Sequence, residues 1–486
     1  MASGEDDDQQ LQKFMSPLSD RPVEDECPVS PDVVGSGELF RFFVPTLTSL
    51  LSSEAMSVVD TAVVGRASAA ELAALGPATM LSDSTAYIFF WLNVATTSLF
   101  ASRLSSSSAD DAYDVLSDAL WVALACGAGL AVALHLFGPA GLAGICGSAA
   151  SESLPAARKY LSIRLLGTPA FMVSTVLQAA CLGSRDSVSP LCVLLVSGTL
   201  NLVLDLHLVI GRGMGIGGAA IATLVAQLAQ MLMLTAVVQR KRARLGASGG
   251  PLLLRGRPAL GRIGAFLKFA GPIFLVLVGK VSCYNAMTLA ATTLGVISLA
   301  SHQVLVSVFF LACKFGDALS QTAQAYLPAC LVASQDSSGP SGSTEVAQTL
   351  SNRLFSLSAL LGAAVAAISY AVVTRAPTLF TTDMLVIAQM RRVAPLIASA
   401  LLIHPACMCA EGLLLGKREL TFLARAYAGN IAVFLTALYA ISRRALGLSA
   451  VWMGLTAFQA VRLAQFGMRA LSVGLIRAPA QGRRTG

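Results

Sequence analysis

Asp60 is the residue of this sequence that points most clearly to chemistry. It lies in the run VVDTAVVGR, at the end of an apolar stretch that begins near Phe40, and nothing local neutralises it. A carboxylate at bilayer depth is rare, and such residues usually face a protein-lined cavity and mark ion or substrate pathways. Asp60 therefore indicates a transporter.

Four further ionisable side chains inside apolar segments are candidates for a substrate cavity: Glu54, Lys280, His302 and Glu411. Lys280 could form an ion pair with Glu54 or with Glu411, and the sequence leaves that choice open. If Lys280 instead faced a cavity without a partner, it would favour an anionic substrate. A satisfied pair is the competing interpretation, because an unpaired ammonium is unfavourable in a bilayer. His302 is a lone histidine in an apolar run, which is more often a hydrogen-bonded packing residue than a proton relay.

The elements that carry these side chains are predicted to be membrane-spanning helices. Of 486 residues, 55% are hydrophobic and 13% are charged, which excludes a soluble domain. Twelve apolar runs reach the length of about 20 residues that a helix needs to cross a bilayer. Strands of a barrel would alternate in polarity, and these runs do not. The predicted spans are 38–65, 71–102, 115–138, 156–183, 189–211, 217–239, 262–294, 297–334, 345–374, 386–415, 419–442 and 449–475.

Charge is distributed unevenly along the chain. Residues 1–37 hold nine acids against two bases, which predicts a disordered acidic tail without the features of a signal or transit peptide. Residues 240–262, after the sixth span, hold seven basic residues and no acid. Because basic loops stay in the cytoplasm, and because the number of spans is even, both termini are predicted to be cytoplasmic. This charge indicates topology and gives no reason to expect a nucleic-acid partner.

Motifs for metals and nucleotides are missing from the sequence. The ten cysteines are scattered through apolar segments without zinc-site spacing, and no GxxxxGK[ST] run is present. We therefore expect no cofactor, no disulfide framework and no metal site, apart from a Na⁺ that could act as the coupling ion. Transport would then be driven by an ion gradient.

The sequence repeats itself. A shift of 227 residues places Pro45 on Pro272, and a shift of 233 places LQAACLGSRD (177–186) on AEGLLLGKRE (410–419). Two matches in order, at nearly the same offset, predict two homologous six-span halves in the same orientation, with a central cleft for substrate. The predicted domains are an acidic tail (1–37), an N lobe (38–240), a basic cytoplasmic linker (241–261), a C lobe (262–475) and a basic tail (476–486).

Six segments in order give the chain a resemblance to a known family: VVDTAVVGR, ELAALGP (71–77), ARKYLSIR (157–164), LGSRDS (182–187), SQTAQAYLP (320–328) and EGLLLGKREL (411–420). From about Glu38 to Leu475 the chain resembles multidrug and toxic compound extrusion (MATE) transporters, and most closely the plant plastid-envelope branch that includes the salicylic acid exporter. The resemblance implies a 6+6 helical bundle that exports an organic solute in exchange for H⁺ or Na⁺ by alternating access. It also implies a protein that is not an enzyme, is monomeric, and has a plastid-envelope location.

The resemblance also assigns a cation-coupling site. The family uses an Asp of the first span, an Asn and an Asp of the fifth, and a Thr of the sixth; Asp60, Asn201, Asp205 and Thr223 match these positions. Asn201 and Asp205 are four residues apart and so share a helical face. Two carboxylates in one apolar pocket cannot easily both stay ionised, so the pair is expected to take up a proton. Na⁺ is the alternative, since neutral oxygens of Asn and Thr suit a hard cation. A purely structural hydrogen-bonded pair is the remaining interpretation.

Pro45 lies fifteen residues before Asp60 and removes a backbone hydrogen bond within the first span. In the family this span is proposed to bend on cation uptake, so Pro45 is a candidate hinge; a static kink is the alternative. The repeat places Met287 at the position of Asp60, so the resemblance assigns cation coupling to the N lobe alone.

Two other classes compete with an antiporter. A flippase of lipid-linked or other amphiphiles would share the lobed helical architecture, but it usually needs a cationic cavity for pyrophosphate, and Lys280 alone is a poor one. A membrane-embedded enzyme would need clustered histidines and acids, and the four histidines do not cluster in the sequence. The expected partners are a small organic substrate and the lipid bilayer.

Overall fold

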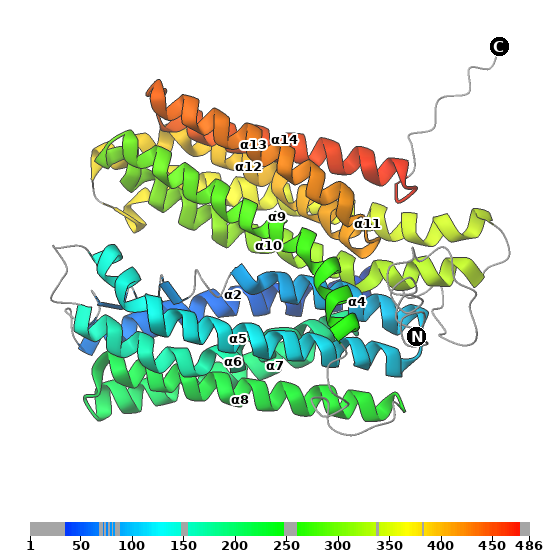
Figure 1. The fold of residues 1–486 in the computed structure, drawn as a ribbon. Coiled ribbons are helices and arrows are strands. Elements are labelled where there is room, and N and C mark those ends of the chain that lie inside the picture. The colour runs from blue at the N-terminus through cyan, green and yellow to red at the C-terminus, as the bar shows by residue number, and fades with distance from the viewer. Residues whose placement is uncertain are drawn as a thin grey trace, which may run out of the picture. The chain divides into compact units, whose positions relative to one another are not determined.

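The structure, a computed structural model, describes residues 35–67, 71, 74–75, 78–79, 81–82, 88–146, 154–246, 260–336, 340–381 and 383–476. Over these residues it is all-helical (Figure 1), which confirms the predicted fold class. The helices are α2 (Ser36–Ala67), η3 (Ile88–Phe90), α4 (Trp91–Ser106), α5 (Ala109–Cys146), α6 (Leu154–Gly183), α7 (Val188–Asp205), η5 (Leu206–Gly211), α8 (Gly215–Arg244), α9 (Leu260–Thr293), α10 (Val296–Asp336), α11 (Pro340–Arg375), η7 (Pro377–Leu379), α12 (Met384–Gly416), α13 (Leu420–Arg443) and α14 (Leu448–Ser472).

Most of these helices coincide with the predicted spans to within a few residues. Nine candidate spans in the described part of the chain are long and apolar enough to cross a membrane; α2, α4 and α14 are outside that set. The second predicted span, 71–102, differs most from the structure. A 3-10 turn, Ile88–Phe90, precedes the 16-residue α4, and residues 83–87 lie outside the described part. The acidic tail 1–34 and most of the basic linker lie outside it as well.

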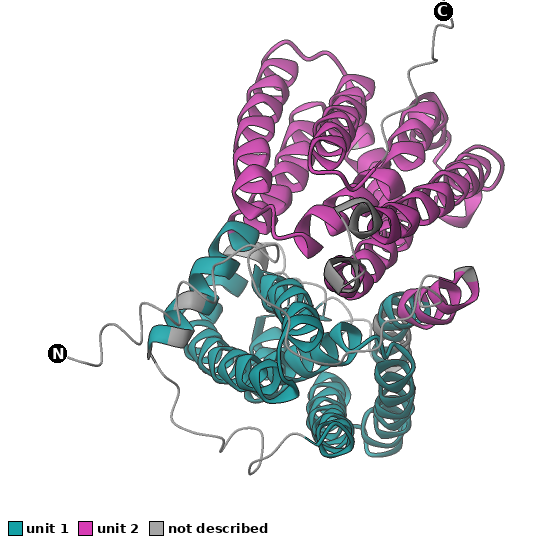
Figure 2. Ribbon diagram, turned by 90° about the vertical axis from the view of Figure 1, so that its right-hand side faces the viewer, with its two compact units in different colours: residues 1–16, 48–274 teal, residues 17–47, 275–486 magenta. Residues whose placement is uncertain are grey.

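The chain divides into two compact units, drawn in different colours in Figure 2. Unit 1 comprises Met1–Ser16 and Thr48–Phe274, and unit 2 comprises Pro17–Leu47 and Leu275–Gly486. The units differ from the predicted lobes at two helices, because the first residues of α2 belong to unit 2 and the first residues of α9 belong to unit 1. Each change of unit falls two residues after a proline, Pro45 in α2 and Pro272 in α9.

Aromatic contacts explain these assignments. In unit 2, the ring of Phe42 packs edge-on against Tyr326 of α10 with centroids 5.5 Å apart. In unit 1, Trp91 at the start of α4 contacts Phe266 and Phe274 of α9, at 6.4 and 6.3 Å. Burial of such large rings is among the strongest contributions to packing.

Each unit is built around one central helix. In unit 1, α6 packs against α4, α5, α7 and α8; in unit 2, α12 packs against α10, α11, α13 and α14. The most apolar windows of α6 and α12 are 67% and 61% buried, more than those of the other candidate spans. The two helices end in the repeated segments LGSRD and LGKRE, so the sequence repeat corresponds to a structural one.

The turns that follow the two central helices are alike in backbone geometry. Arg185 and Arg418 both adopt left-handed conformations, with φ of 59° and 64°. In each turn the next residue, Asp186 or Glu419, donates its backbone N–H to a carbonyl of the last helical turn, at 2.9 Å in both cases. This is the usual way of capping the C-terminal carbonyls of a helix.

The acid of each turn also forms an ion pair with another helix of its own unit. Asp186 Oδ2 lies 2.7 Å from Lys241 Nζ of α8, and Glu419 Oε2 lies 2.8 Å from Arg469 Nη2 of α14. The two pairs link the turn after the central helix to α8 in unit 1 and to α14 in unit 2.

Candidate functional site

The predicted coupling residues Asp60, Asn201 and Asp205 meet in unit 1. The Asn201 amide donates from Nδ2 to Asp60 Oδ1 at 2.7 Å and to Asp205 Oδ2 at 3.1 Å. It therefore joins α2 to α7. Asn201 is 3% exposed and Asp205 is completely buried, so the carboxyl group of α7 lies inside the protein, away from lipid.

Asp205 lies at the junction between the α-helical and π-helical parts of its span. α7 ends at Asp205 and continues as a π-helical turn, Leu206–Gly211. Departures of this kind from α-helical hydrogen bonding are frequent at functional sites. Here the change follows directly after the two polar side chains of α7.

Two oxygens of this cluster accept no hydrogen bond from the described residues. They are Asn201 Oδ1 and Asp205 Oδ1, and both are buried. The side chains of Asp60 and Asp205 also interact directly with each other. Buried acceptors without a donor are unfavourable, and a proton on the acid pair, or a cation bound to the free oxygens, would satisfy them.

Thr223, the fourth predicted member, is oriented toward its own helix. Its hydroxyl donates to the Ala219 carbonyl at 2.9 Å. Within the described part of the chain, hydrogen bonds thus join three of the four predicted residues, and Thr223 is not bonded to them. Its oxygen still has acceptor capacity, because a hydroxyl that donates one hydrogen bond retains its lone pairs.

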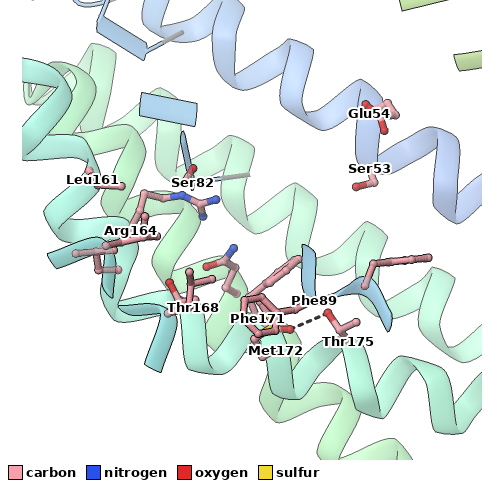
Figure 3. A pocket seen from close by; sticks show the side chains of 15 residues that line it. Ser53, Glu54, Ser82, Phe89, Leu161, Arg164, Thr168, Phe171, Met172 and Thr175 are labelled. Carbon is pink, nitrogen blue, oxygen red and sulfur yellow. Dashed lines mark hydrogen bonds between the residues drawn. The ribbon is translucent and has the colours of Figure 1, made fainter. Parts of the chain in front are cut away.

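Unit 1 also contains a cavity of about 350 Å³ (Figure 3). Glu54, a predicted substrate-cavity residue, lines it together with a basic, several hydroxyl-bearing and several aromatic side chains. The described residues that line it are Ser53, Glu54, Ser82, Phe89, Phe90, Leu130, Leu134, Leu161, Arg164, Leu165, Thr168, Phe171, Met172, Thr175 and Gln227.

Arg164 of this cavity was not among the candidate residues predicted from the sequence. It belongs to the family-like segment ARKYLSIR, and its charge lies inside a predicted span. The available signal was its place ten residues after the start of α6, which is roughly 15 Å along the helix axis. A guanidinium at that depth is unusual enough to suggest a function.

Unit 2 holds a buried ion network around Glu411. Lys280 Nζ lies 2.7 Å from Glu411 Oε1, and Arg462 Nη2 lies 2.8 Å from Glu411 Oε2. The Tyr427 hydroxyl donates to the same carboxylate and accepts from Arg462. The choice that the sequence left open for Lys280 therefore falls to Glu411.

This network extends to a histidine and a glutamine. Arg462 Nη1 donates to Gln459 Oε1 at 2.8 Å, and Gln459 Nε2 lies 2.9 Å from His404 Nδ1. Arg462 was not among the residues predicted from the sequence, although it is a charge in the middle of a predicted span and only 1% exposed. His302 is also fully buried; it contacts Thr288 at 3.3 Å and packs against Trp452, with ring centroids 5.8 Å apart.

Metal clusters of three or more His, Cys, Asp or Glu residues are not found among the described residues. The acid pair of unit 1 and its neutral neighbour Asn201 bring carboxylate and amide groups together in one buried cluster.

Comparisons with known proteins agree with this architecture. The MatE family profile matches residues 45–206. The chain is 31% identical over 437 residues to the protein DETOXIFICATION 47, chloroplastic, of Arabidopsis thaliana, covering 90% of this chain and 78% of the relative.

Solved structures share the fold. The Vibrio cholerae MATE transporter VcmN in its bent form is similar with a TM-score of 0.75 at 18% identity, over 92% of this chain and 99% of that one. A MOP superfamily transporter from Pyrococcus furiosus gives a TM-score of 0.77 at 18% identity, over 93% and 100% of the two chains.

The fold is thus that of a membrane transporter. The chain belongs to the MATE family of multidrug and toxic compound efflux transporters, which confirms the resemblance seen in the sequence.

Proposed function

We propose that the chain is a secondary antiporter that exports an organic solute in exchange for H⁺ or Na⁺, with Asp60, Asn201 and Asp205 as the coupling site and Thr223 as an additional oxygen ligand. The observation that carries this proposal is the pair of buried oxygens, Asn201 Oδ1 and Asp205 Oδ1, that accept no hydrogen bond from the described residues. A site with open acceptors beside a second carboxyl group can load and release one cation.

Ordinary gradients are sufficient to drive this exchange. One proton moving down one pH unit yields about 1.4 kcal/mol, and one charge crossing 100 mV yields about 2.3 kcal/mol. The sum corresponds to more than a hundredfold solute gradient, at about 1.4 kcal/mol per factor of ten. Coupling to an ion gradient is therefore adequate without a nucleotide.

The cavity of unit 1 supports a small organic substrate. Its volume of about 350 Å³ is within the usual range for small-molecule sites, and its apolar walls with a few polar groups are typical of them. Glu54 is assigned to this substrate site. Lys280, Glu411 and His302, by contrast, are engaged in contacts within unit 2.

Conformational change and location complete the proposal. Pro45 and its repeat partner Pro272 stand next to the points where α2 and α9 pass from one unit to the other, a place where a hinge would act. The basic residues at the end of α8 and in the linker that follows it favour cytoplasmic or stromal termini. The chloroplastic name of the relative from Arabidopsis thaliana supports a plastid membrane.

The test is gradient-driven uptake into proteoliposomes of a cationic dye and of an aromatic carboxylate, under an imposed H⁺ or Na⁺ gradient. Wild-type protein is expected to accumulate one of them, and Asp60→Asn is expected to lose accumulation. Asp383→Asn is the matched control: Asp383 caps the N-terminus of α12 by accepting from Leu385 and Val386, and Asn caps equally well. Uptake by Asp60→Asn at the wild-type level would overturn the assignment of the coupling site.

A further inference from the structure

α8 is the candidate span that the rest of the protein covers least. Its most apolar window is 22% buried, the lowest value among the nine candidate spans in the described part of the chain. Exposed side chains recur along it every three or four residues, at Val225, Leu228, Leu232 and Ala236. Because residues three and four apart share one face of a helix, these side chains form a single stripe, the lipid stripe of α8.

Four basic residues lie at the end of α8, and two of them are turned into the protein. Lys241 Nζ lies 2.7 Å from Asp186 Oδ2 and donates to the Ser184 hydroxyl at 2.9 Å. Arg242 is 5% exposed, and its guanidinium lies over the ring of Tyr113, 6.0 Å from the centroid. Both bases therefore have their partners inside unit 1.

The other two bases, Arg240 and Arg244, are turned outward. Both side chains are exposed, and no hydrogen bond or ion pair joins either of them to another described residue. They continue the lipid stripe, four and eight residues after Ala236. α8 has 30 residues, or a length of about 45 Å, which matches a bilayer of about 40–45 Å with its headgroup layers. The last turn of α8 therefore lies at the depth of the headgroups.

The preference of basic residues for one side of a membrane explains why α8 ends in a basic run. That preference does not explain why two of the bases lie in the stripe that faces lipid. A guanidinium presents a planar fork of donors that matches two oxygens of a phosphate. Leu228 and Leu232, in the preceding turns of the same stripe, offer an apolar surface. Together these side chains fit a molecule with an anionic head and apolar tails.

α8 and α14 end in the same way, which aligns the two helices residue by residue. Each is followed by a glycine with positive φ, Gly246 at 67° and Gly474 at 76°. In both helices the base five residues before this glycine forms the ion pair with the turn acid. The repeat therefore extends to the ends of the sixth and twelfth predicted spans.

The outward-facing bases are a feature of α8 and not of α14. In the alignment, Met468 occupies the position of Arg240. Ser472 occupies the position of Arg244. Met468 is 62% exposed and Ser472 is exposed as well, so these positions face outward in both units. Unit 2 therefore carries no charge at the two positions that continue the lipid stripe in unit 1.

We propose that the end of α8 binds an anionic phospholipid, with Arg240 and Arg244 on its phosphate and an acyl chain along Leu232 and Leu228. The site belongs to the membrane-facing surface of unit 1 and is separate from the coupling cluster and from the cavity. The aligned positions of α14 are not part of such a site, because they carry no charge. The inference does not depend on the proposed antiport.

Native mass spectrometry of the full chain, titrated with single lipids in detergent, tests the inference. Phosphatidylglycerol and phosphatidylcholine with the same acyl chains differ in net charge. Wild-type protein is expected to bind one phosphatidylglycerol about 25-fold more tightly than phosphatidylcholine, since each basic side chain at a membrane surface contributes about fivefold. Equal affinities for the two lipids would overturn the inference.

Two reciprocal variants locate the site. Arg240→Met with Arg244→Ser gives α8 the residues of α14, and it is expected to lose the tightly bound phosphatidylglycerol without weakening phosphatidylcholine. Met468→Arg with Ser472→Arg gives α14 the residues of α8, and it is expected to bind one phosphatidylglycerol more than wild type. Unchanged phosphatidylglycerol binding in the α8 variant would overturn the inference. No added lipid in the α14 variant would contradict the assignment of the headgroup to these two positions.

A soluble headgroup separates a lipid site from a site for free phosphate. Glycerophosphoglycerol carries the same phosphate diester as phosphatidylglycerol but has no acyl chains. Because an acyl chain is expected to pack along the lipid stripe, a large excess of glycerophosphoglycerol should leave phosphatidylglycerol bound. Displacement by glycerophosphoglycerol at concentrations as low as those of the competing lipid would show that the site takes a soluble phosphate, and it would overturn the assignment to a lipid.

Discussion

In unit 1 the buried carboxyl group of Asp205 keeps one oxygen without a hydrogen bond from the described residues. In unit 2 the buried carboxylate of Glu411 has both oxygens engaged, by Lys280, Arg462 and Tyr427. The two units share helix order, a central helix and the turn that follows it, but they differ in their interior chemistry. The carboxyl cluster of unit 1 thus has an oxygen without a donor among the described residues, whereas the carboxylate of unit 2 is already paired with two cationic side chains.

The repeat explains how one scaffold supports both arrangements. The position of Asp60 is occupied in unit 2 by Met287, which is 1% exposed, so the acid of the first helix is replaced by an apolar packing residue. Charge in unit 2 enters instead from α9, α12 and α14, through Lys280, Glu411 and Arg462. Backbone architecture therefore constrains the positions of the helices and leaves the sites free to diverge.

Breaking the ion network of unit 2 should give the largest loss of stability. Glu411→Gln would leave Lys280 and Arg462 without their shared carboxylate, and removing one partner of a buried ion pair costs about 3–5 kcal/mol. We expect a correspondingly large fall in the thermal unfolding temperature of the purified protein, measured in detergent.

Lys280→Met is the matched control for this loss. It removes the more exposed cation, 16% accessible against 2% for Arg462, and leaves the Arg462–Glu411 pair intact. It should therefore cost clearly less than Glu411→Gln. An equal or greater loss with Lys280→Met would show that the two cations do not share one carboxylate as described.

The glycines that end the central helices offer a smaller, paired test of the repeat. A Cβ at Gly183 would lie 3.0 Å from the backbone oxygen of Thr97, whereas one at Gly416 would lie 3.3 Å from the side chain of Leu327. A side chain can shift more easily than a backbone, so Gly183→Ala should destabilise by about 1–3 kcal/mol and Gly416→Ala by less. Thermal unfolding of the two variants measures this, and the reverse order would contradict the proposed packing.

The turn acid Asp186 gives the smallest effect, one that depends on pH. Burial would raise the pKa of this carboxyl, but hydrogen bonds from Lys241 and Ser189 and the charge of Lys241 outweigh it, so its pKa is lowered. Because the pKa is lower in the folded state, the ionised carboxylate of Asp186 stabilises the fold above the ordinary pKa of about 3.9. This stabilisation is lost as the pH falls through the lower pKa of the folded state.

Asp186→Asn keeps the backbone hydrogen bond that caps α6 but loses the ion pair with Lys241. The side chains of Lys241 and Asp186 are 23% and 20% exposed, so the cost at neutral pH should be at most about 1 kcal/mol. The difference in unfolding free energy between wild type and Asp186→Asn should shrink as the pH falls below about 4. A difference that grows with acidity would mean that the charge of Asp186 is not what stabilises the turn.

Sequence reasoning placed most helices well, because membrane spans leave a continuous apolar signal. The three residues that meet at the proposed coupling site could also be predicted, since Asn201 and Asp205 are on one face of a single helix and Asp60 is a lone acid in an apolar run. The 3-10 turn before α4 escaped it, because the apolar run continues through Ile88–Phe90 without a break in polarity.

Side-chain pairing between distant helices could not be predicted from the sequence. Glu411, Tyr427 and Arg462 come from α12, α13 and α14, and their meeting depends on how these helices pack. The same holds for Arg164, whose place in a cavity wall is set by α2, α5 and α8 around it. The orientation of the Thr223 hydroxyl toward Ala219 was likewise hidden, because a serine or threonine in a helix can bond to its own backbone.

The central claim is that unit 1 moves the coupling ion and unit 2 does not. The most direct test is to add substrate to proteoliposomes without any imposed gradient and to follow the ion flux that it drives, with a pH-sensitive and a sodium-sensitive dye inside the vesicles. We predict a flux with wild type and with Asp383→Asn, and none with Asp60→Asn or Asp205→Asn, although both of these should still exchange labelled for unlabelled substrate. An undiminished flux through Asp205→Asn would contradict the account.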